Sequence, residues 1–397
     1  MFCNNDKRLF CNLQLNKMTS IISAFGSEFK EYKVGKIVKL AKDKPLKLSS
    51  GVEIDNFNLA YKTYGTLNDD KSNAILICHP ITGDQYVASK HPVTQKKGWW
   101  DFMVGKGKSI DTNKYFVICA NVLGGCMGSF GPKDTDPKTN KSYATNFPFI
   151  TIDDMVKAEK LLLEHLGVNK LLAIIGGSMG GMMALSWSNL YPNIAKSIIP
   201  IATSYRNSAQ NIAFNEVGRQ AIMSDNDWCL GGYMEEKKFP VKGLAIARMT
   251  AHITYMSKKS LHKKFGRNLQ DKSFLSYNFD VDFQVESYLR HQGFSFVKRF
   301  DPNSYLYLSK AIDYFDLEAD HGVLSKAFID CSSKFCIISL TDDWLFAPEE
   351  SKKLVRSLNI AGKDASLINI EGGAGHDSFL IENDILKNTI KGFLEAI

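Results

Sequence analysis

The amino-acid sequence predicts an α/β protein with a mostly parallel central sheet and a helical insertion. Buried strand-like runs alternate with helical segments in the first half of the chain, and this alternation returns near the C-terminus. Such alternation indicates a largely parallel sheet. Between residues 205 and 315 the strand-like runs are missing, and helix formers, aromatics and Lys or Arg dominate. We therefore expect a core made of residues 31–204 and 316–397, and a helical lid domain at 205–315.

The composition is that of an ordinary globular protein, with 44% hydrophobic and 23% charged residues. The net charge of +7 is spread in small clusters, which fits a solvated surface and is also compatible with an anionic small-molecule substrate. Nucleic-acid binding is not expected, because it needs a concentrated basic stripe or a known module. The eight cysteines lack the spacing of a zinc site, so no metal is expected. Free thiols within apolar runs favour a reducing cytoplasm.

Residues 1–30 form an expected N-terminal extension that is poorly ordered. They are polar and irregular, and they lack the apolar core of a secretory signal. Either Met1 or Met18 is the natural start. No stretch of the sequence approaches the roughly 18 continuous apolar residues of a transmembrane helix, so no membrane association is expected.

The first core elements are predicted to be short strands, two buried strands and a helix. Residues 32–68 alternate in polarity and contain turn residues, which predicts short strands. The runs 73–84 and 114–125 read as buried strands that continue into loops. Residues 151–167 follow as an amphipathic helix, with Thr151 as its N-cap and Gly167 as its end.

The later core elements surround the insertion. Residues 170–192 predict a strand, a sharp turn and a helix, and residues 194–204 predict the next strand. After the insertion, residues 334–348 and 364–380 each begin with a strand-like run. Residues 383–397 predict a closing helix.

The segment Gly176-Gly177-Ser178-Met179-Gly180 fits G-x-S-x-G between a predicted strand and a predicted helix. In a nucleophile elbow the serine occupies a strained turn, and small neighbours let the strand and the helix approach each other. The helix N-terminus favours negative charge, and the Met179 N–H can donate to an oxyanion. A glycine-rich helix entry with a serine cap would show the same pattern, so Ser178 needs catalytic partners to count as a nucleophile.

A serine nucleophile requires a histidine base that is held by an acid. Where the serine lies on a strand-to-helix elbow, the acid and then the histidine follow it along the chain. His376 lies after a predicted strand, where the base is expected, whereas His321 reads as a surface or packing residue. The acid should follow the preceding strand, where Asp342 and Asp343 both stand. The residue pattern alone favours neither.

A second oxyanion donor should come from the loop after an early strand. The segment "ICHPITGD" has that position. Pro80 has no N–H, so the backbone N–H of Ile81 is the expected donor. A strand that simply continues into a loop, without an oxyanion role, would show the same sequence pattern.

Together these segments resemble the homoserine O-acetyltransferase family of α/β-hydrolase-fold acyltransferases. The resemblance runs from about Phe57 to the C-terminus. It rests on "ITGDQYVA", "NVLGGCMGSFGP", "GGSMGGMMALSW", "SAQNIAFNEVGRQAI", "GLAIARMTAHITY", "SYLYLSKAIDYFDL", "DDWLFAPE" and "GHDSFLIE". The family places its acid immediately before Trp in the "DWLF" segment. The resemblance therefore implies a catalytic triad of Ser178, Asp343 and His376.

The resemblance also implies that Arg248 and Asp377 bind the substrate. The chemistry agrees, because a guanidinium suits the α-carboxylate of homoserine and a carboxylate suits its α-ammonium. Two residues depart from the family pattern. Phe130 stands where a threonine is common, and Pro80 stands where a small residue is usual. Neither belongs to the triad, but they leave the choice of acyl group open.

The implied reaction is ping-pong transfer of an acetyl group from acetyl-CoA to L-homoserine, in methionine biosynthesis. Acetyl-CoA is a co-substrate, no bound cofactor is expected, and the family suggests a homodimer formed through the lid helices. The nearest alternatives are homoserine O-succinyltransferase and serine O-acetyltransferase. A lidded esterase or thioesterase is more remote, and Arg248 with Asp377 argues against it. The intact triad argues against a catalytically inactive binding scaffold.

Overall fold

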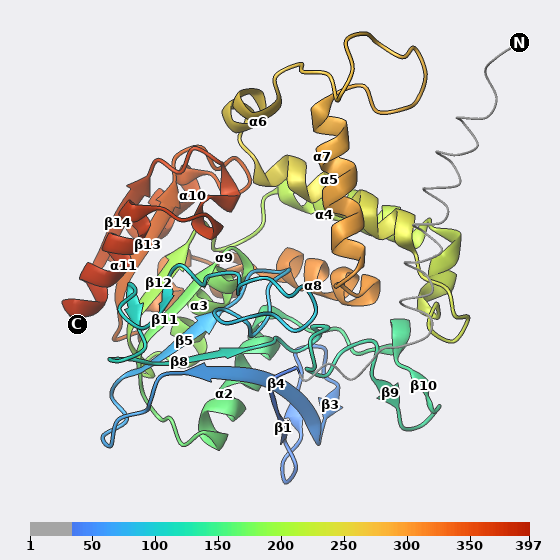
Figure 1. Ribbon diagram of the computed structural model, residues 1–397. Helices are drawn as coiled ribbons and strands as arrows, with labels where there is room; N and C mark the ends of the chain where they lie inside the picture. Colours follow the sequence, from blue (N-terminus) through green and yellow to red (C-terminus); the bar gives the residue numbers. More distant parts are fainter. Residues whose placement is uncertain (1–33) are drawn as a thin grey trace, which may run out of the picture.

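A computed structural model describes residues 34–397, so the predicted extension at 1–30 lies outside the described residues (Figure 1). The centre of the molecule is an eight-stranded sheet with the order β1-β4-β8-β5-β11-β12-β13-β14. Its strands are β1 (Lys36–Leu40), β4 (Phe57–Tyr64), β5 (Ala74–Cys78), β8 (Phe116–Ala120), β11 (Leu171–Gly177), β12 (Ala195–Ile201), β13 (Lys334–Leu340) and β14 (Ala365–Ile370). Only β1 with β4 and β4 with β8 pair antiparallel in this sheet. The predicted α/β class with a mostly parallel sheet is confirmed.

Three two-stranded ribbons lie outside the main sheet. They consist of β2 (Leu46–Lys47) with β3 (Glu53–Ile54), β6 (Val104–Gly105) with β7 (Ile110–Asp111), and β9 (Thr135–Asp136) with β10 (Lys141–Ser142). The helices of the core are α2 (Ile152–His165), α3 (Met179–Leu190), α9 (Leu317–His321), α10 (Pro348–Ile360) and α11 (Asp384–Glu395), with 3-10 turns η1 (Ala144–Asn146), η3 (Leu324–Phe328) and η4 (His376–Leu380).

Apolar residues cover both faces of the sheet, as buried parallel strands require. Along β5 the side chain of Leu76 joins one hydrophobic cluster, whereas Ile75 and Ile77 join another. The first cluster includes apolar residues of α2, α3 and α10, and the second includes those of α11. The helices therefore form a layer on each side of the sheet.

The predicted helix at 151–167 forms as α2, and its sequence explains its start. Thr151 accepts a hydrogen bond from the Asp154 N–H, and the Asp154 carboxylate accepts one from the Thr151 N–H. This reciprocal capping box satisfies two N–H groups that the helix cannot pair internally. Gly167 follows the C-cap with φ 67°, a conformation that glycine adopts without strain.

Between β12 and α9 the chain is helical. The segment contains α4 (Ala209–Met223), η2 (Asn226–Gly231), α5 (Val241–Tyr255), α6 (Lys258–Phe265), α7 (Gln284–Val297) and α8 (Pro302–Tyr314). In Figure 1 helices α4 to α7 form a group beyond the sheet, and α8 lies between this group and the strands. Helix α5 packs against α4 and α7.

The end of α5 is tied to the core by two hydrogen bonds to backbone groups. The Trp344 indole N–H donates to the Met256 carbonyl at 3.0 Å, and the Ser257 N–H donates to the Ala374 carbonyl at 3.2 Å. A Cβ on Gly375 would lie 2.4 Å from the Ser257 nitrogen, so only glycine fits at this contact. The helical segment is therefore fastened to two loops that follow β13 and β14.

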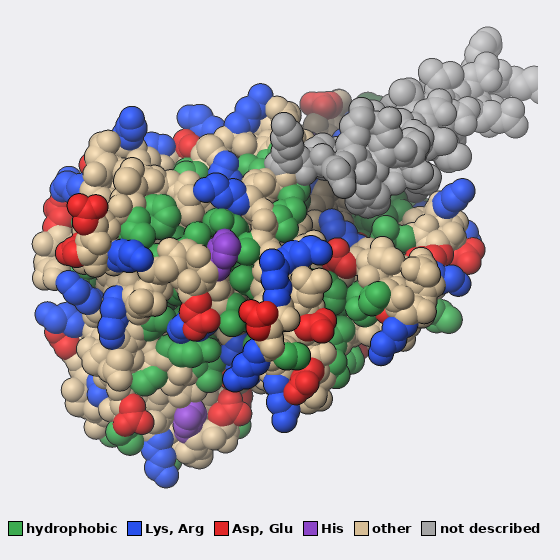
Figure 2. Space-filling model, turned by 90° about the horizontal axis from the view of Figure 1, so that it is seen from below, with side chains coloured by type: hydrophobic (Ala, Val, Ile, Leu, Met, Phe, Trp, Pro, Cys, Tyr) green, Lys and Arg blue, Asp and Glu red, His purple; other side chains and the backbone are tan. Residues whose placement is uncertain are grey.

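Charged side chains are interspersed over the face seen in Figure 2, where Lys and Arg alternate with Asp, Glu and apolar residues. Among the helices of residues 34–397, none combines the length and the apolar character that a bilayer-spanning segment needs.

Candidate active site

Ser178 lies in the sharp turn between β11 and α3. Its backbone has φ 58° and ψ −123°, a conformation that costs free energy for a residue with a Cβ. A Cβ on Gly176 would lie 2.0 Å from the Gly180 carbonyl oxygen, and one on Gly180 would lie 2.1 Å from the Cys78 carbonyl oxygen. The two flanking glycines therefore provide the clearance that this strained turn needs.

Ser178, His376 and Asp343 form a hydrogen-bonded chain. The Ser178 hydroxyl donates to His376 Nε2 at 3.0 Å, and His376 Nδ1 donates to Asp343 Oδ2 at 2.7 Å. The exposed fractions of the three residues are 8%, 2% and 3%. The other carboxylate oxygen of Asp343 accepts hydrogen bonds from the Leu345 and Phe346 N–H groups. This arrangement can deprotonate a serine.

The structure distinguishes the two adjacent acids after β13. Asp343 faces His376, whereas neither carboxylate oxygen of Asp342 has a hydrogen-bond partner among the described residues. The residue pattern did not decide which of these two acids is catalytic, and the family resemblance implied Asp343. The hydrogen-bond geometry points to the same residue.

The electrostatics of His376 suit a base. Burial by itself lowers the pKa of the imidazole, but the attraction of Asp343 and the hydrogen bond to it act in the opposite direction, and Asp377 adds to them. The net effect raises the pKa of His376 above its usual value. A more basic imidazole accepts the serine proton more readily.

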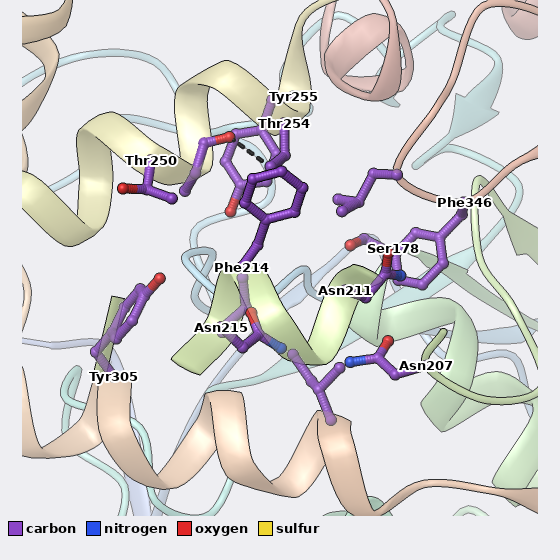
Figure 3. A pocket seen from close by; sticks show the side chains of 14 residues that line it. Ser178, Asn207, Asn211, Phe214, Asn215, Thr250, Thr254, Tyr255, Tyr305 and Phe346 are labelled. Carbon is purple, nitrogen blue, oxygen red and sulfur yellow. Dashed lines mark hydrogen bonds between the residues drawn. The ribbon is translucent and has the colours of Figure 1, made fainter. Parts of the chain in front are cut away.

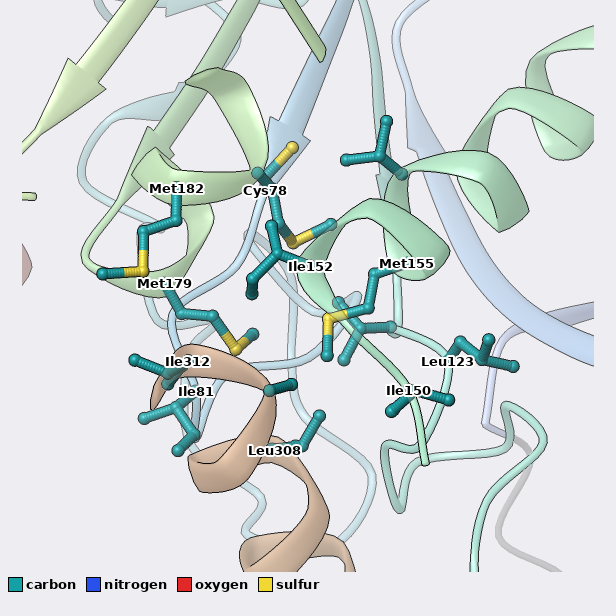
Figure 4. Packing of buried hydrophobic residues seen from close by; sticks show 14 of the residues in the cluster. Cys78, Ile81, Leu123, Ile150, Ile152, Met155, Met179, Met182, Leu308 and Ile312 are labelled. Atoms are coloured by element: carbon teal, nitrogen blue, oxygen red, sulfur yellow. The ribbon is translucent and has the colours of Figure 1, made fainter. Parts of the chain in front are cut away.

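Two backbone amides stand beside Ser178. Met179 is the first residue of α3, and Ile81 lines the same cavity as Ser178. Within residues 34–397 neither N–H donates a hydrogen bond. Figure 4 shows Ile81 and Met179 in a hydrophobic cluster with Leu308 and Ile312 of α8. Both amides are available for an oxyanion, and apolar packing holds their residues in place.

His79 supports the loop that carries Ile81. Its Nδ1 donates to the Pro80 carbonyl at 2.8 Å, and its Nε2 accepts from the Val122 N–H at 3.1 Å. Burial lowers the pKa of His79, which favours the neutral tautomer that these bonds need. His79 precedes the serine in the chain, where the base is not expected, and the sequence gives no signal for this supporting position.

Within residues 34–397, the two departures from the family pattern form no hydrogen bond with the triad. Phe130 packs among aromatic rings, with centroids 5.0 Å from Phe147 and 5.3 Å from Tyr143. The Pro80 carbonyl accepts hydrogen bonds from His79 and from the Gly83 N–H. Phe130 therefore serves the core, and Pro80 belongs to the supported loop.

A cavity of about 50 Å³ adjoins Ser178 (Figure 3). Its walls come from the core and from the helical segment, and they include Tyr255 of α5, Tyr305 of α8 and Phe346 after β13. The Tyr255 ring also lies 5.7 Å from the His376 ring. The serine thus faces a small cavity that the helical segment helps to line.

Arg248 and Asp377 lie next to this cavity. The Arg248 guanidinium is 5.5 Å from the Tyr255 ring and donates to the Thr82 hydroxyl at 3.4 Å. Asp377 follows the base directly, and burial raises its pKa although His376 and Arg248 oppose that shift. Neither charge forms an ion pair among the described residues. Both are therefore free to bind opposite charges of a ligand.

Arg299 is a third charged group at this position that the sequence did not indicate. It donates from Nη1 to the Thr82 carbonyl at 2.9 Å, and its guanidinium lies 5.3 Å from the Phe296 ring. The Arg248 guanidinium lies 4.7 Å from the same ring. Burial and the neighbouring Arg248 lower the pKa of Arg299. In the sequence, Arg299 resembles any other cation of a helical segment.

The fold and the Ser–His–Asp chain define the class of protein. A family model described as alpha/beta hydrolase fold matches residues 73–382, so the molecule is an α/β-hydrolase-fold protein with a serine site. Homoserine O-acetyltransferase of Mesorhizobium japonicum is 55% identical over 359 residues, which cover 90% of this chain and 92% of the relative. Homoserine O-acetyltransferase of Pelagibacter ubique is 55% identical over 89% of this chain and 95% of its own length. The chain belongs to the homoserine O-acetyltransferase family.

Solved structures of two kinds resemble the molecule. A homoserine O-acetyltransferase from Bacillus anthracis superimposes with a TM-score of 0.84 and 28% identity, over 90% of this chain and 96% of that chain. The esterase E22 superimposes with a TM-score of 0.82 and 29% identity, over 90% of this chain and 99% of that chain. The same architecture thus accompanies both a transferase and a hydrolase, so the site must distinguish them.

Proposed function

We propose that this protein transfers an acetyl group from acetyl-CoA to the hydroxyl of L-homoserine, by a ping-pong mechanism, in methionine biosynthesis. One observation carries the proposal. Arg248 and Asp377, which form no ion pair in the described structure, lie beside a complete Ser–His–Asp chain. A hydrolase needs only the chain and water, whereas opposite free charges fit a zwitterionic acceptor. The names of the relatives agree with this substrate.

The first half-reaction forms an acetyl-serine. His376 Nε2 takes the proton of the Ser178 hydroxyl while Oγ attacks the thioester carbonyl carbon. The carbonyl oxygen becomes negative and accepts hydrogen bonds from the N–H groups of Ile81 and Met179. The carbon–sulfur bond then breaks, and the thiol of coenzyme A leaves with the proton from His376.

The second half-reaction moves the acetyl group to the acceptor. Arg248 binds the α-carboxylate of homoserine, and Asp377 binds its α-ammonium. His376 takes the proton of the substrate hydroxyl, whose oxygen attacks the acetyl carbon. The bond to Ser178 breaks, and His376 returns the proton to the serine oxygen. The helical segment beside Ser178 limits the access of water, which would otherwise hydrolyse the acetyl-serine.

We also propose a homodimer formed through the helical segment. Apolar side chains on α4 and α5 are exposed, including Val217 at 52% and Ile246 at 48%. Exposed apolar residues on neighbouring helices favour a protein interface. Light scattering should give the mass of two chains for the purified protein and of one chain for Ile246→Glu, and a wild-type monomer would refute the dimer.

The transferase assay uses the purified full chain. It receives acetyl-CoA or succinyl-CoA together with homoserine, serine or water, and the release of free coenzyme A is measured. We expect rapid release only with acetyl-CoA and homoserine, with O-acetylhomoserine as the product. Equal release without any amino acid would show a thioesterase and refute the transferase proposal. Faster release with succinyl-CoA or with serine would correct the donor or the acceptor.

A further inference from the structure

Asn207 lies in the loop between β12 and α4, where two cavities meet. It lines the cavity at Ser178 and also a second cavity of about 300 Å³. The two cavities share Asn207, Asn211, Leu345 and Phe346 as walls. Asn207 therefore lies at the shared boundary, or passage, between the cavity at Ser178 and the larger cavity.

The orientation of the Asn207 amide is fixed by chemistry. Its Nδ2 donates to Asp313 Oδ1 at 2.9 Å, and Asp313 also accepts from Asn215 at 2.7 Å and from Arg219 at 2.7 Å. An ionised carboxylate can only accept, so the amide nitrogen must face Asp313. In Figure 3 the nitrogen of Asn207 points toward α8 and its oxygen points toward Asn211 and Phe346.

The Asn207 oxygen has no partner. Asn207 is 8% exposed, and its Oδ1 is buried without a hydrogen bond among the described residues. A buried carbonyl oxygen that lacks a donor costs free energy, and native proteins rarely keep one. A ligand that brings an N–H group to this passage would remove the cost.

The walls of the second cavity indicate a polar ligand segment that carries no negative charge. They include Ser204 and Ser208, together with Arg206 and Glu350. Arg206 already pairs with Glu318 at 3.0 Å and with Asp316 at 3.8 Å. The charge of Arg206 is therefore compensated within the protein, and Asp316 and Glu350 also line the cavity, so the walls favour neither an anion nor a hydrocarbon chain.

We propose that Asn207 Oδ1 accepts a hydrogen bond from an amide N–H of the acyl donor, and that the second cavity holds the donor's pantetheine arm. In a coenzyme A thioester a short ethylene linker separates the sulfur from the first amide. An acyl group at Ser178 thus places that amide near the passage. This assignment rests on the proposed function and adds the residue that recognises the donor.

The α-ammonium of the amino-acid acceptor is the other source of N–H groups. Asp377 offers it a carboxyl group next to the base, whereas Asn207 offers only an amide oxygen toward the second cavity. The position of the second cavity favours the donor arm. The two sources predict different kinetic defects, so one set of variants separates them.

The experiment compares two acyl donors in the first half-reaction. Acetyl-CoA carries the amide, and p-nitrophenyl acetate does not. We expect Asn207→Leu and Asn207→Ala to lower the ratio of kcat/KM for acetyl-CoA to that for p-nitrophenyl acetate by about tenfold, as the loss of one buried hydrogen bond predicts. The burst of nitrophenol counts the intact Ser178 sites in each preparation, so misfolded protein does not enter the ratio.

Asn215→Ala is the matched control, because it removes an equivalent bond to Asp313 at 2.7 Å. We expect it to keep the ratio of the two donors. An equal loss for both donors in the Asn207 variants would show a structural role and overturn the assignment. A rise confined to the KM of homoserine would place the acceptor there instead. A wild type that reacts with p-nitrophenyl acetate but never with acetyl-CoA would refute the proposed function itself.

Discussion

The two halves of the active site differ in how completely their polar groups are paired. On the core side, Ser178, His376 and Asp343 use their polar side-chain atoms in hydrogen bonds within the protein. Buried polar groups that are fully bonded hold one geometry. The catalytic residues of the core half therefore hold their reactive geometry before a substrate binds.

In the described structure, the helical half keeps two cations that form no ion pair and one amide oxygen that accepts no hydrogen bond. Arg248 and Arg299 have no carboxylate in contact, and Asn207 Oδ1 has no donor. Polar groups without partners at a cavity raise the free energy of the protein without ligand. A ligand that pairs with them removes this cost when it binds. Under the proposed function, the core carries the chemistry, and the helical segment supplies recognition groups that complement Asp377 on the core side. Each prediction below tests one side of this division.

The largest effect is expected for Ser178→Ala. We expect kcat to fall by about 10⁴-fold or more, because Ser178 carries the hydroxyl that is hydrogen-bonded to His376. The fold should persist, since alanine replaces a small side chain at an unchanged backbone. Coenzyme A release and the thermal midpoint measure the two effects. Substantial remaining turnover would remove Ser178 as the nucleophile.

The two adjacent acids provide the next test. Asp343→Asn should lower kcat by about 10³- to 10⁴-fold, because the amide no longer stabilises the imidazolium. Asp342→Asn is the matched control, since its carboxylate has no partner in the described structure. We expect it to retain most activity. A comparable loss in both variants would show that the hydrogen bond to His376 does not select the acid.

Arg248→Ala tests the recognition half. We expect the KM of homoserine to rise by about 10- to 100-fold, the usual range for losing a charge-assisted hydrogen bond. Acetylation of Ser178 by acetyl-CoA should change much less. Steady-state kinetics with homoserine and a rapid-quench measurement of acetylation separate the two. A variant that no longer acetylates Ser178 would assign Arg248 another role.

Glu159 is an exception on the core side, and changing it should have the smallest effect on activity. It is buried on α2, its Oε2 accepts from the Trp187 indole at 2.9 Å, and its Oε1 has no partner in the described structure. Burial raises the pKa of Glu159 to about 8. The folded state therefore keeps a proton that the unfolded chain loses at its ordinary, lower pKa.

The consequence is a pH dependence of stability. The stabilisation from this proton is complete below the pKa of the unfolded chain and is lost as pH rises through the folded value. We expect the thermal midpoint of the wild type to fall by several degrees between about pH 6 and pH 9. Glu159→Gln should flatten that decline, with kcat close to the wild type. An unchanged pH slope in the variant would contradict the assignment.

The sequence predicted the chemical half of the site better than the recognition half. The pattern around Ser178 and the chain order of His376 are local signals, because a nucleophile elbow needs glycines and a strand. Asp342 and Asp343 could not be separated by pattern, since adjacent residues in a turn point in different directions. Only the resemblance, and then the geometry, selected one.

The supporting and recognition groups gave no such signal. His79, Asn207 and Arg299 act through contacts with residues far away in the chain, such as Val122, Asp313 and Thr82. A single sequence does not encode these distances in any local period or motif. The parallel sheet and the helical segment, in contrast, follow from the spacing of apolar residues.

The bonds that tie the end of α5 to the loops of the acid and the base have a consequence for substrate traffic. Trp344 and Ser257 fasten the end of α5 on the side where Asp343 and His376 stand. Displacing α5 there would pull on both loops and disturb the triad. We therefore expect ligands to reach Ser178 without a displacement of α5 at this end, so that the catalytic geometry stays intact throughout the reaction.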